Sequence, residues 1–102
     1  MFLALDTGSG RTLLTPAVIR MLGYALPFDG PSERIATVTE VVTRPVMQIQ
    51  ELAALGTRRR DVQVLVSSLP RGVSFHGLLG LDFLRNARLT IDFRRGEIEL
   101  ET

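Results

Sequence analysis

The sequence predicts one mainly β domain that closes on itself and carries one or two short helices. Segments with strand patterns outnumber segments with helical patterns, and no repeat, linker or low-complexity tract divides the chain. A chain of 102 residues can bury one hydrophobic core, but it is too short for two lobes with a cleft between them. An active site built from two halves would therefore need a second chain.

The first third of the sequence predicts a strand, a turn and a helix. Residues 2–5 are apolar and lead into Asp-Thr-Gly-Ser-Gly at residues 6–10, as when a buried strand enters a glycine-rich turn. A short helix is predicted over residues 16–22, because Thr15 can cap it, proline occupies its first position and glycine follows its end. The buried face of this helix is expected to hold Val18, Ile19 and Leu22.

The middle of the sequence predicts a projecting pair of strands and then a third strand. Residues 34–43 and 46–52 are rich in β-branched side chains, as strands are. Pro45 between them has no backbone donor, which places it at an edge or a bulge. After a turn at residues 56–59, residues 61–66 alternate apolar and polar side chains, which indicates a half-buried strand.

The last third predicts a short helix and a closing hairpin. Gly-Leu-Leu-Gly at residues 77–80 precedes a helix of one to two turns over residues 81–86, with Asp82 at the positive end of its dipole. Residues 88–93 and 97–101 alternate as strands on either side of an Arg-Arg-Gly turn. These two strands would close the domain.

Composition excludes several classes of function. With 12 basic and 11 acidic residues the net charge is +1, which gives no electrostatic reason to expect a nucleic acid or an anionic membrane as partner. The chain has no cysteine and one histidine, His76, so the usual metal and iron–sulfur sites lack ligands, and no metal or cofactor is expected. No membrane-spanning run or signal peptide is visible. We expect a soluble, cytoplasmic chain, although nothing in the sequence fixes the compartment.

The Asp-Thr-Gly sequence at residues 6–8 is the segment best suited to chemistry. Gly8 and Gly10 let backbone N–H groups approach the Asp6 carboxylate closely, which would hold it ionised and oriented. Taken alone, the tripeptide favours an ordinary Asx-type turn between strands. A functional loop becomes the favoured interpretation once a second motif is considered. This motif is Gly-Leu-Leu-Gly-Leu-Asp-Phe-Leu at residues 77–84, which directly precedes the closing hairpin.

The two ends of the chain together resemble a known family. FLALDTGSGRTLLTPAVIRMLG at residues 2–23 and HGLLGLDFLRNARLTIDFRRGEIEL at residues 76–100 are similar to the retropepsin-like aspartic proteases, especially bacterial single-domain members. The resemblance implies that residues 1–102 form one retropepsin-like closed β-barrel that pairs about a two-fold axis. Relatives usually place a further strand before the Asp-Thr-Gly strand. The resemblance therefore implies that this chain lacks a native N-terminal strand.

The same resemblance implies roles for individual residues. Asp6 would be the catalytic carboxylate. Its loop would be supported by Thr7, Gly8 and Ser9. Thr7 would interlock with the same threonine of a second chain beneath the site, and Gly8 would offer backbone donors to the carboxylate. The residues packing across the Asp6 loop would be Leu78, Leu79 and Gly80.

The predicted middle hairpin would be the family's flap, a lid over bound peptide. The residues at its tip would be Val38, Thr39, Glu40 and Val41. Family flaps often carry glycine at the tip, and this tip has none. An ordinary surface hairpin is the alternative interpretation.

The resemblance therefore implies an aspartic endopeptidase that acts on peptides as a homodimer, through a water activated by two Asp6 carboxylates. One chain would not supply both, because no other aspartate stands in a second such loop. Asp82 is explained as a helix-start residue and Asp92 as an outward strand residue. The alternatives are a retropepsin-like domain that binds proteins or dimerises without proteolysis, and an unrelated β-barrel binding module.

Two further features have ordinary explanations. Arg58, Arg59 and Arg60 fall at a predicted turn, where they are expected to form a solvated loop and not a docking site. His76 precedes Gly77 at a place where relatives often have an acidic residue, and we expect it to be a surface or rim residue without a catalytic role.

Overall fold

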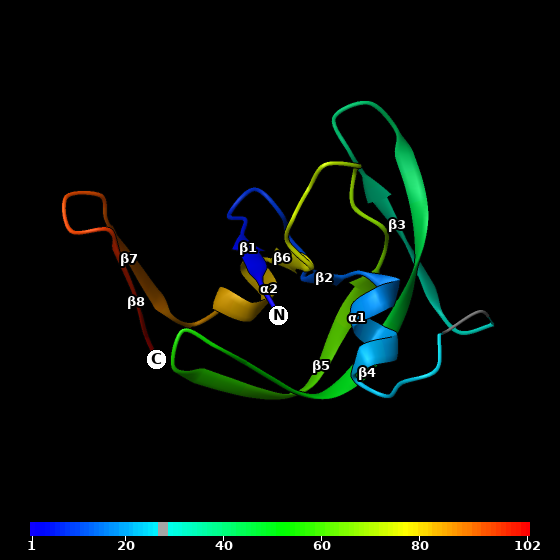
Figure 1. The fold of residues 1–102 in the computed structure, drawn as a ribbon, viewed down its shortest axis with the longest axis horizontal. Coiled ribbons are helices and arrows are strands. Elements are labelled where there is room, and N and C mark those ends of the chain that lie inside the picture. The colour runs from blue at the N-terminus through cyan, green and yellow to red at the C-terminus, as the bar shows by residue number, and fades with distance from the viewer. Residues whose placement is uncertain (27–28) are drawn as a thin grey trace.

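The computed structural model describes residues 1–26 and 29–102, and in this part of the chain β-strands are the main secondary structure (Figure 1). In chain order the elements are β1 (Leu3–Leu5), β2 (Leu13–Leu14), α1 (Pro16–Met21), β3 (Ser32–Ala36), β4 (Val41–Ala54), β5 (Thr57–Val66), β6 (Gly77–Leu79), α2 (Leu81–Leu84), β7 (Arg88–Asp92) and β8 (Glu97–Glu101). The prediction of a mainly β chain with one or two short helices is confirmed, and the described part of the chain has two. Neither helix of the described residues is long and apolar enough to cross a membrane.

The strands form one curled six-stranded sheet and one separate hairpin. The order in the large sheet is β1-β6-β2-β5-β4-β3, and β7 pairs only with β8 within the described residues. β6 lies between β1 and β2, parallel to β1 and antiparallel to β2. Because the sheet ends on β1 at one side and on β3 at the other, the predicted closed barrel is not confirmed. The segment that became β6 was not predicted to be a strand.

The hydrophobic core lies between α1, α2 and the concave side of the sheet. Its fully buried apolar side chains are Leu14, Val18, Ile19, Ile49, Val64 and Phe83. The predicted cap of α1 is present, since Thr15 accepts a hydrogen bond from the Val18 backbone N–H. Leu22 was expected to be buried and is instead 46% exposed. The reason is that the helix ends at Met21, and Leu22 is the C-cap residue from which the chain turns away.

The projecting hairpin consists of β3 and β4 and reverses at residues 37–40. The prediction that residues 34–43 form one strand is therefore wrong. Thr37 makes the reversal possible, because its hydroxyl oxygen accepts hydrogen bonds from the N–H groups of Thr39 and Glu40. Pro45 lies inside β4, opposite Ser32, at the residue where pairing passes from β3 to β5. A missing donor is tolerated at such a transition.

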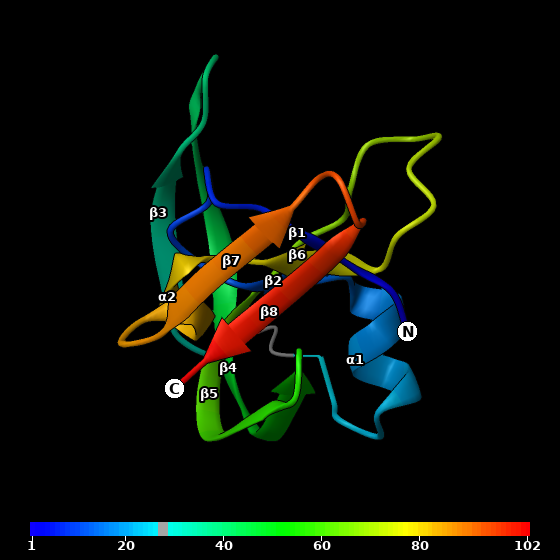
Figure 2. The same ribbon diagram turned by 90° about the vertical axis from the view of Figure 1, so that its left-hand side faces the viewer.

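Two other segments differ from expectation. The turn after β4 is made by Leu55 and Gly56, both with positive φ, so that β5 begins at Thr57 and residues 58–60 lie in a strand and not in a loop. The hairpin of β7 and β8 stands to one side of the molecule, visible in orange and red in Figures 1 and 2. It carries Phe93, which is 91% exposed, just after β7.

Candidate active site

The Asp6 loop begins where β1 ends, and β6 fixes that end. Leu5 is paired with Leu79, and the Asp6 N–H donates to the Leu79 carbonyl at 3.0 Å. The Gly8 N–H in turn donates to Asp6 Oδ1 at 2.9 Å. A half-buried carboxylate at a strand end is thus held in one orientation by the backbone two residues further on.

Two glycines allow this close packing. A Cβ atom on Gly8 would lie 3.2 Å from Asp6 Oδ1, which is tighter than an ordinary van der Waals contact. A Cβ atom on Gly80 would lie 2.5 Å from the Arg11 carbonyl oxygen and 2.9 Å from that of Ser9. Because Gly80 has no side chain, the Asp6 loop can rest on the connection from β6 to α2, where the Leu81 N–H donates to the Ser9 carbonyl at 2.8 Å.

The structure thus brings most of the predicted site residues into one neighbourhood. Leu79 and Gly80 contact the Asp6 loop directly, as described above, and Leu78 is half-buried beside it. The Ser9 hydroxyl donates to the Arg11 carbonyl at 2.7 Å and stiffens the loop. Thr7 is exposed in the single chain.

A buried threonine and an aspartate fasten the far end of the loop, and sequence reasoning missed this pair. Thr12 is fully buried, its hydroxyl donates to Asp82 Oδ1 at 2.7 Å, and its N–H donates to Asp82 Oδ2 at 3.0 Å. The same hydroxyl accepts from the Gly80 N–H at 3.1 Å. Asp82 is therefore more than a helix-start residue, because it ties α2 to the segment between the loop and β2.

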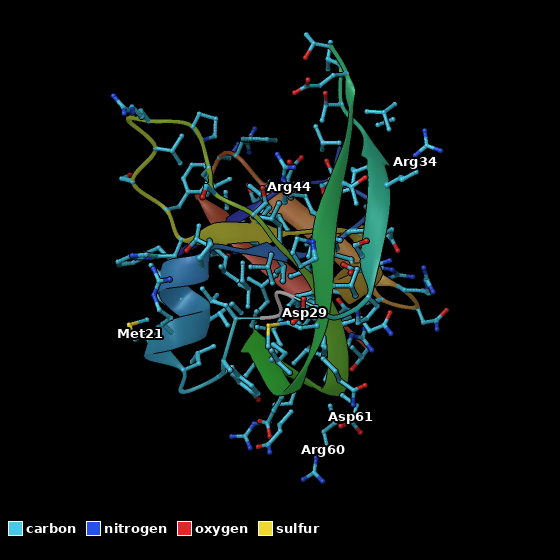
Figure 3. The ribbon with its side chains drawn as sticks, turned by 90° about the vertical axis from the view of Figure 1, so that its right-hand side faces the viewer. Met21, Asp29, Arg34, Arg44, Arg60 and Asp61 are labelled. Carbon is cyan, nitrogen blue, oxygen red and sulfur yellow. The ribbon has the colours of Figure 1, made fainter. Side chains whose placement is uncertain are left out.

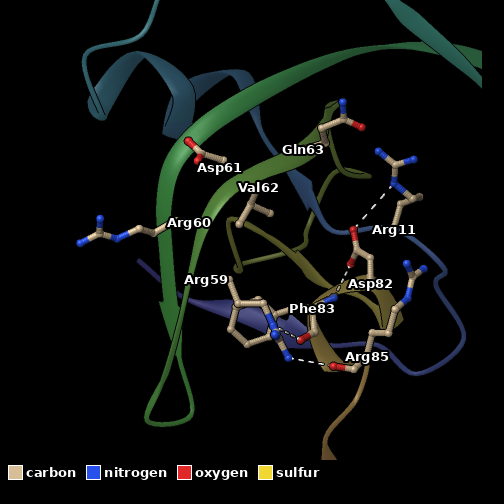
Figure 4. Close-up of a pocket in the computed structure, with 9 residues that line it drawn as sticks. All are labelled: Arg11, Arg59, Arg60, Asp61, Val62, Gln63, Asp82, Phe83 and Arg85. Carbon is tan, nitrogen blue, oxygen red and sulfur yellow. Dashed lines mark hydrogen bonds and ion pairs between the residues drawn. The ribbon is translucent and has the colours of Figure 1, made fainter. Parts of the chain in front are cut away.

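Arg11 joins this network to the hairpin. Its Nη1 lies 2.6 Å from Glu33 Oε1 on β3. Its Nε lies 3.7 Å from Asp82 Oδ2, a contact drawn in Figure 4. The guanidinium therefore links three elements: the Asp6 loop, α2 and the start of the hairpin.

Arg59 corrects the expectation of a solvated arginine loop. Its Nε donates to the Phe83 carbonyl at 2.7 Å and its Nη2 to the Arg85 carbonyl at 2.9 Å, and the guanidinium lies 5.4 Å from the centre of the Phe83 ring (Figure 4). Cations commonly satisfy the last carbonyls of a helix in this way. Arg58 and Arg60 are exposed on the strand.

His76 and Asp92 both have structural partners. His76 Nδ1 accepts from the Phe2 N–H at 3.0 Å, and the two rings are stacked with centroids 6.3 Å apart. His76 therefore anchors the segment before β1. Asp92 is half-buried, and its Oδ1 accepts from the N–H groups of Arg94 and Arg95 in the turn after β7.

A cleft of about 520 Å³ separates the Asp6 loop from the projecting hairpin. Its lining includes Gly8, Ser9 and Gly10 from the loop and Thr37, Glu40 and Val42 from the hairpin. At the tip, Val38 is fully exposed and Thr39 and Val41 are also exposed. The predicted flap residues thus stand at the outer end of a hairpin that borders the same cleft as the Asp6 loop. Among the described residues, no group of three or more histidine or acidic side chains could hold a metal ion.

The fold and the loop together define a class of protein. The structure is similar to the crystal structure of a retropepsin-like aspartic protease from Rickettsia conorii, with a TM-score of 0.60 and 17% sequence identity over 95% of this chain and 68% of that one. The fold is therefore retropepsin-like. The family model described as aspartyl protease matches residues 2–83, and the chain belongs to that family. No curated protein matches it.

Proposed function

We propose that this chain is an aspartic endopeptidase that hydrolyses peptide bonds as a homodimer, with Asp6 of each subunit in one shared site. The observation that carries the proposal is the Asp6 carboxylate, held at 2.9 Å by the Gly8 N–H in a loop that borders a cleft. Membership of the aspartyl protease family and the retropepsin-like fold support it. Residues 1–102 would act as a single domain.

The need for two chains follows from the chemistry and from the shape of one chain. Each chain has one Asp-Thr-Gly loop, and Asp82 is occupied by hydrogen bonds from Thr12. Thr7 is exposed and free to meet the partner subunit's Thr7. The hairpin of β7 and β8 exposes the apolar side chains of Ile91, Phe93 and Ile98, and it forms a sheet separate from the six-stranded one. Both features support a second copy of the chain, which would extend or close the β structure at this hairpin.

The proposed mechanism uses only carboxylates and water. Two carboxyl groups about 3 Å apart cannot both ionise in a sheltered site, so they share one proton, as characterised aspartic proteases do. The ionised Asp6 takes a proton from the attacking water, while the protonated carboxyl of the other subunit polarises the peptide carbonyl. The water oxygen bonds to the carbonyl carbon to give a tetrahedral diol. The C–N bond then breaks as a proton passes to the leaving nitrogen.

The other predicted residues would prepare this site. The Gly8 N–H would keep the Asp6 carboxylate oriented, while Ser9, Leu78, Leu79 and Gly80 would hold the loop in place. The hairpin tip at residues 38–41 would close over bound peptide and exclude water. Its turn is built on the Thr37 hydroxyl and not on glycine, so the hairpin would move as a stiff unit.

The proposal is tested with purified chain and a library of internally quenched peptides, read across acid to neutral pH. We expect cleavage that decreases as the pH rises, because the shared proton is lost. Asp6→Asn should abolish cleavage, whereas Asp61→Asn should retain it, since Asp61 is exposed at φ 53°, a conformation that asparagine also accepts. Sedimentation would report the dimer. Undiminished cleavage by Asp6→Asn contradicts the proposal, and a stable dimer that cleaves no peptide favours a binding module.

A further inference from the structure

Arg44 is the half-buried cation on the wall of the cleft for which the described residues provide no charged partner, whereas Arg34, which also lines the cleft, is exposed. Arg44 lies in β4, and its cross-strand neighbour on β3 is Glu33. Paired residues of antiparallel strands share a face, so Arg44 lies on the same face as Glu33, which contacts Arg11 of the Asp6 loop. Figure 3 shows Arg44 between the hairpin and the body of the molecule. Together with Gly8 and Ser9, it lines the cleft.

The guanidinium of Arg44 is held in place by neutral groups. Its Nε donates to Ser67 Oγ at 2.9 Å, and its Nη1 donates to the Thr43 carbonyl at 3.0 Å. A guanidinium has five N–H donors, and these contacts leave several of them without a protein acceptor. The side chain is therefore oriented in advance but not saturated.

No carboxylate of the described residues lies within 4.0 Å of this charge. Glu33 is adjacent across the strands, but its carboxylate is paired with Arg11 at 2.6 Å. Glu40, which does line the cleft, lies in the exposed turn of the hairpin. The positive charge of Arg44 is thus available to a molecule that enters the cleft.

We infer that Arg44 selects peptides by binding a carboxylate of the substrate, either an Asp or Glu side chain or a free C-terminal carboxylate. The inference rests on the proposed function. An oriented guanidinium pairs with a carboxylate through two parallel N–H···O bonds, which gives both affinity and directional specificity. In a two-fold dimer the preference would occur twice, once on each side of the cleaved bond, because each subunit contributes one Arg44.

Binding tests the inference separately from catalysis. The Asp6→Asn chain is titrated with fluorescent eight-residue apolar peptides that are blocked at both ends and carry Glu, Gln or Lys at one scanned position. We expect the Glu peptide to bind about threefold to tenfold more tightly than the Gln peptide at one position or at two symmetric positions. This is the gain in affinity expected from a partly exposed, charge-assisted ion pair. A second set of peptides carries only Gln at the scanned position and ends in either a free carboxylate or an amide. This set tests whether Arg44 binds the C-terminal carboxylate of a peptide.

Three variants of Arg44 and a matched control complete the experiment. Arg44→Gln should abolish the preference, and Arg44→Lys should retain part of it. Arg44→Glu should reverse it so that Lys binds more tightly than Gln, a gain that an unfolded variant could not produce. Arg60→Gln removes the same charge from an exposed strand position far from Arg44 (Figure 3) and should leave the preference unchanged.

The outcomes separate this inference from the proposed function. A preference for carboxylate peptides without hydrolysis by the unaltered chain would support the inference and contradict the endopeptidase. Hydrolysis with equal binding of Glu, Gln, free-acid and amide peptides would overturn the inference and leave the endopeptidase standing. A folded chain that binds none of the peptides, or a preference that survives Arg44→Gln, would also overturn it.

Discussion

Asp82 accepts two hydrogen bonds from Thr12, one from its N–H at 3.0 Å and one from its hydroxyl at 2.7 Å. The two residues are 70 positions apart in sequence, and their contact fastens α2 to the segment that follows the Asp6 loop. Since Thr12 is fully buried, its hydroxyl cannot be replaced by water without opening the core.

The first prediction concerns this pair. Thr12→Val keeps the shape of the side chain but removes the acceptor of the Gly80 N–H and one of the donors to Asp82 Oδ1, which still accepts from the Phe83 N–H. We expect the free energy of unfolding to fall by about 1–3 kcal/mol, the cost of one unsatisfied buried donor and one lost hydrogen bond to a charged group. Urea unfolding would measure it. Thr90→Val, at an exposed position of β7, is the control and should stay within about 0.5 kcal/mol of the unaltered chain.

The second prediction concerns the close approach of Gly80 to the Asp6 loop. Gly80→Ala places a Cβ atom 2.5 Å from the Arg11 carbonyl oxygen, so the loop must shift. We expect a loss of about 1–3 kcal/mol, the usual cost of overpacking, together with loss of peptide cleavage. Gly10→Ala in the same loop meets nothing within 4 Å and should be close to neutral. Equal stability of the two variants would refute the packing argument.

The third prediction concerns the hairpin turn. Thr37→Val removes the acceptor for the N–H groups of Thr39 and Glu40, whereas Thr37→Ser retains it. We expect faster hydrogen exchange of these two amides in the valine variant only, because their local opening costs less. Should residues 38–41 act as a flap, the same variant would also raise KM for peptide. Unchanged exchange in Thr37→Val would show that the turn does not depend on the hydroxyl.

The fourth prediction separates Arg59 from its neighbour. Arg59→Gln removes a charged donor from the carbonyls of Phe83 and Arg85 and a cation from the face of the Phe83 ring. We expect a loss of about 1–2 kcal/mol in unfolding free energy, discounted for partial exposure. Arg58→Gln, whose side chain is 79% exposed, should change stability by less than about 0.5 kcal/mol. A larger effect at Arg58 than at Arg59 would contradict the structure.

The parts of the fold that depend on neighbouring residues could be predicted from the sequence. Helix α1 begins where Thr15 and Pro16 indicate, since a cap and a proline act within one turn. The apolar run that ends at Asp6 is β1. The Asp6 loop and the Gly-Leu-Leu-Gly segment were expected to be adjacent only through the family resemblance, and the structure places them together.

The remaining features depend on contacts between distant residues or on an unusual turn. Nothing local in the sequence indicates that Asp82 accepts from Thr12, or that Arg59 binds the end of α2. Residues 34–43 were wrongly predicted as one strand because they have strand propensity throughout, and the turn within them uses a threonine hydroxyl in place of glycine or asparagine. A β-branched residue is counted as a strand former even where its side chain ends the strand.

The position of β6 between β1 and β2 has a consequence for synthesis. The two strands that flank the Asp6 loop do not pair with each other in the sheet, because residues 77–79 separate them. A nascent chain that has not yet reached these residues cannot hold the loop in its final geometry. Long-range pairing of this kind is slow to form. A growing polypeptide of this sequence would therefore complete the surroundings of the Asp6 loop only after residues 77–79 have left the ribosome.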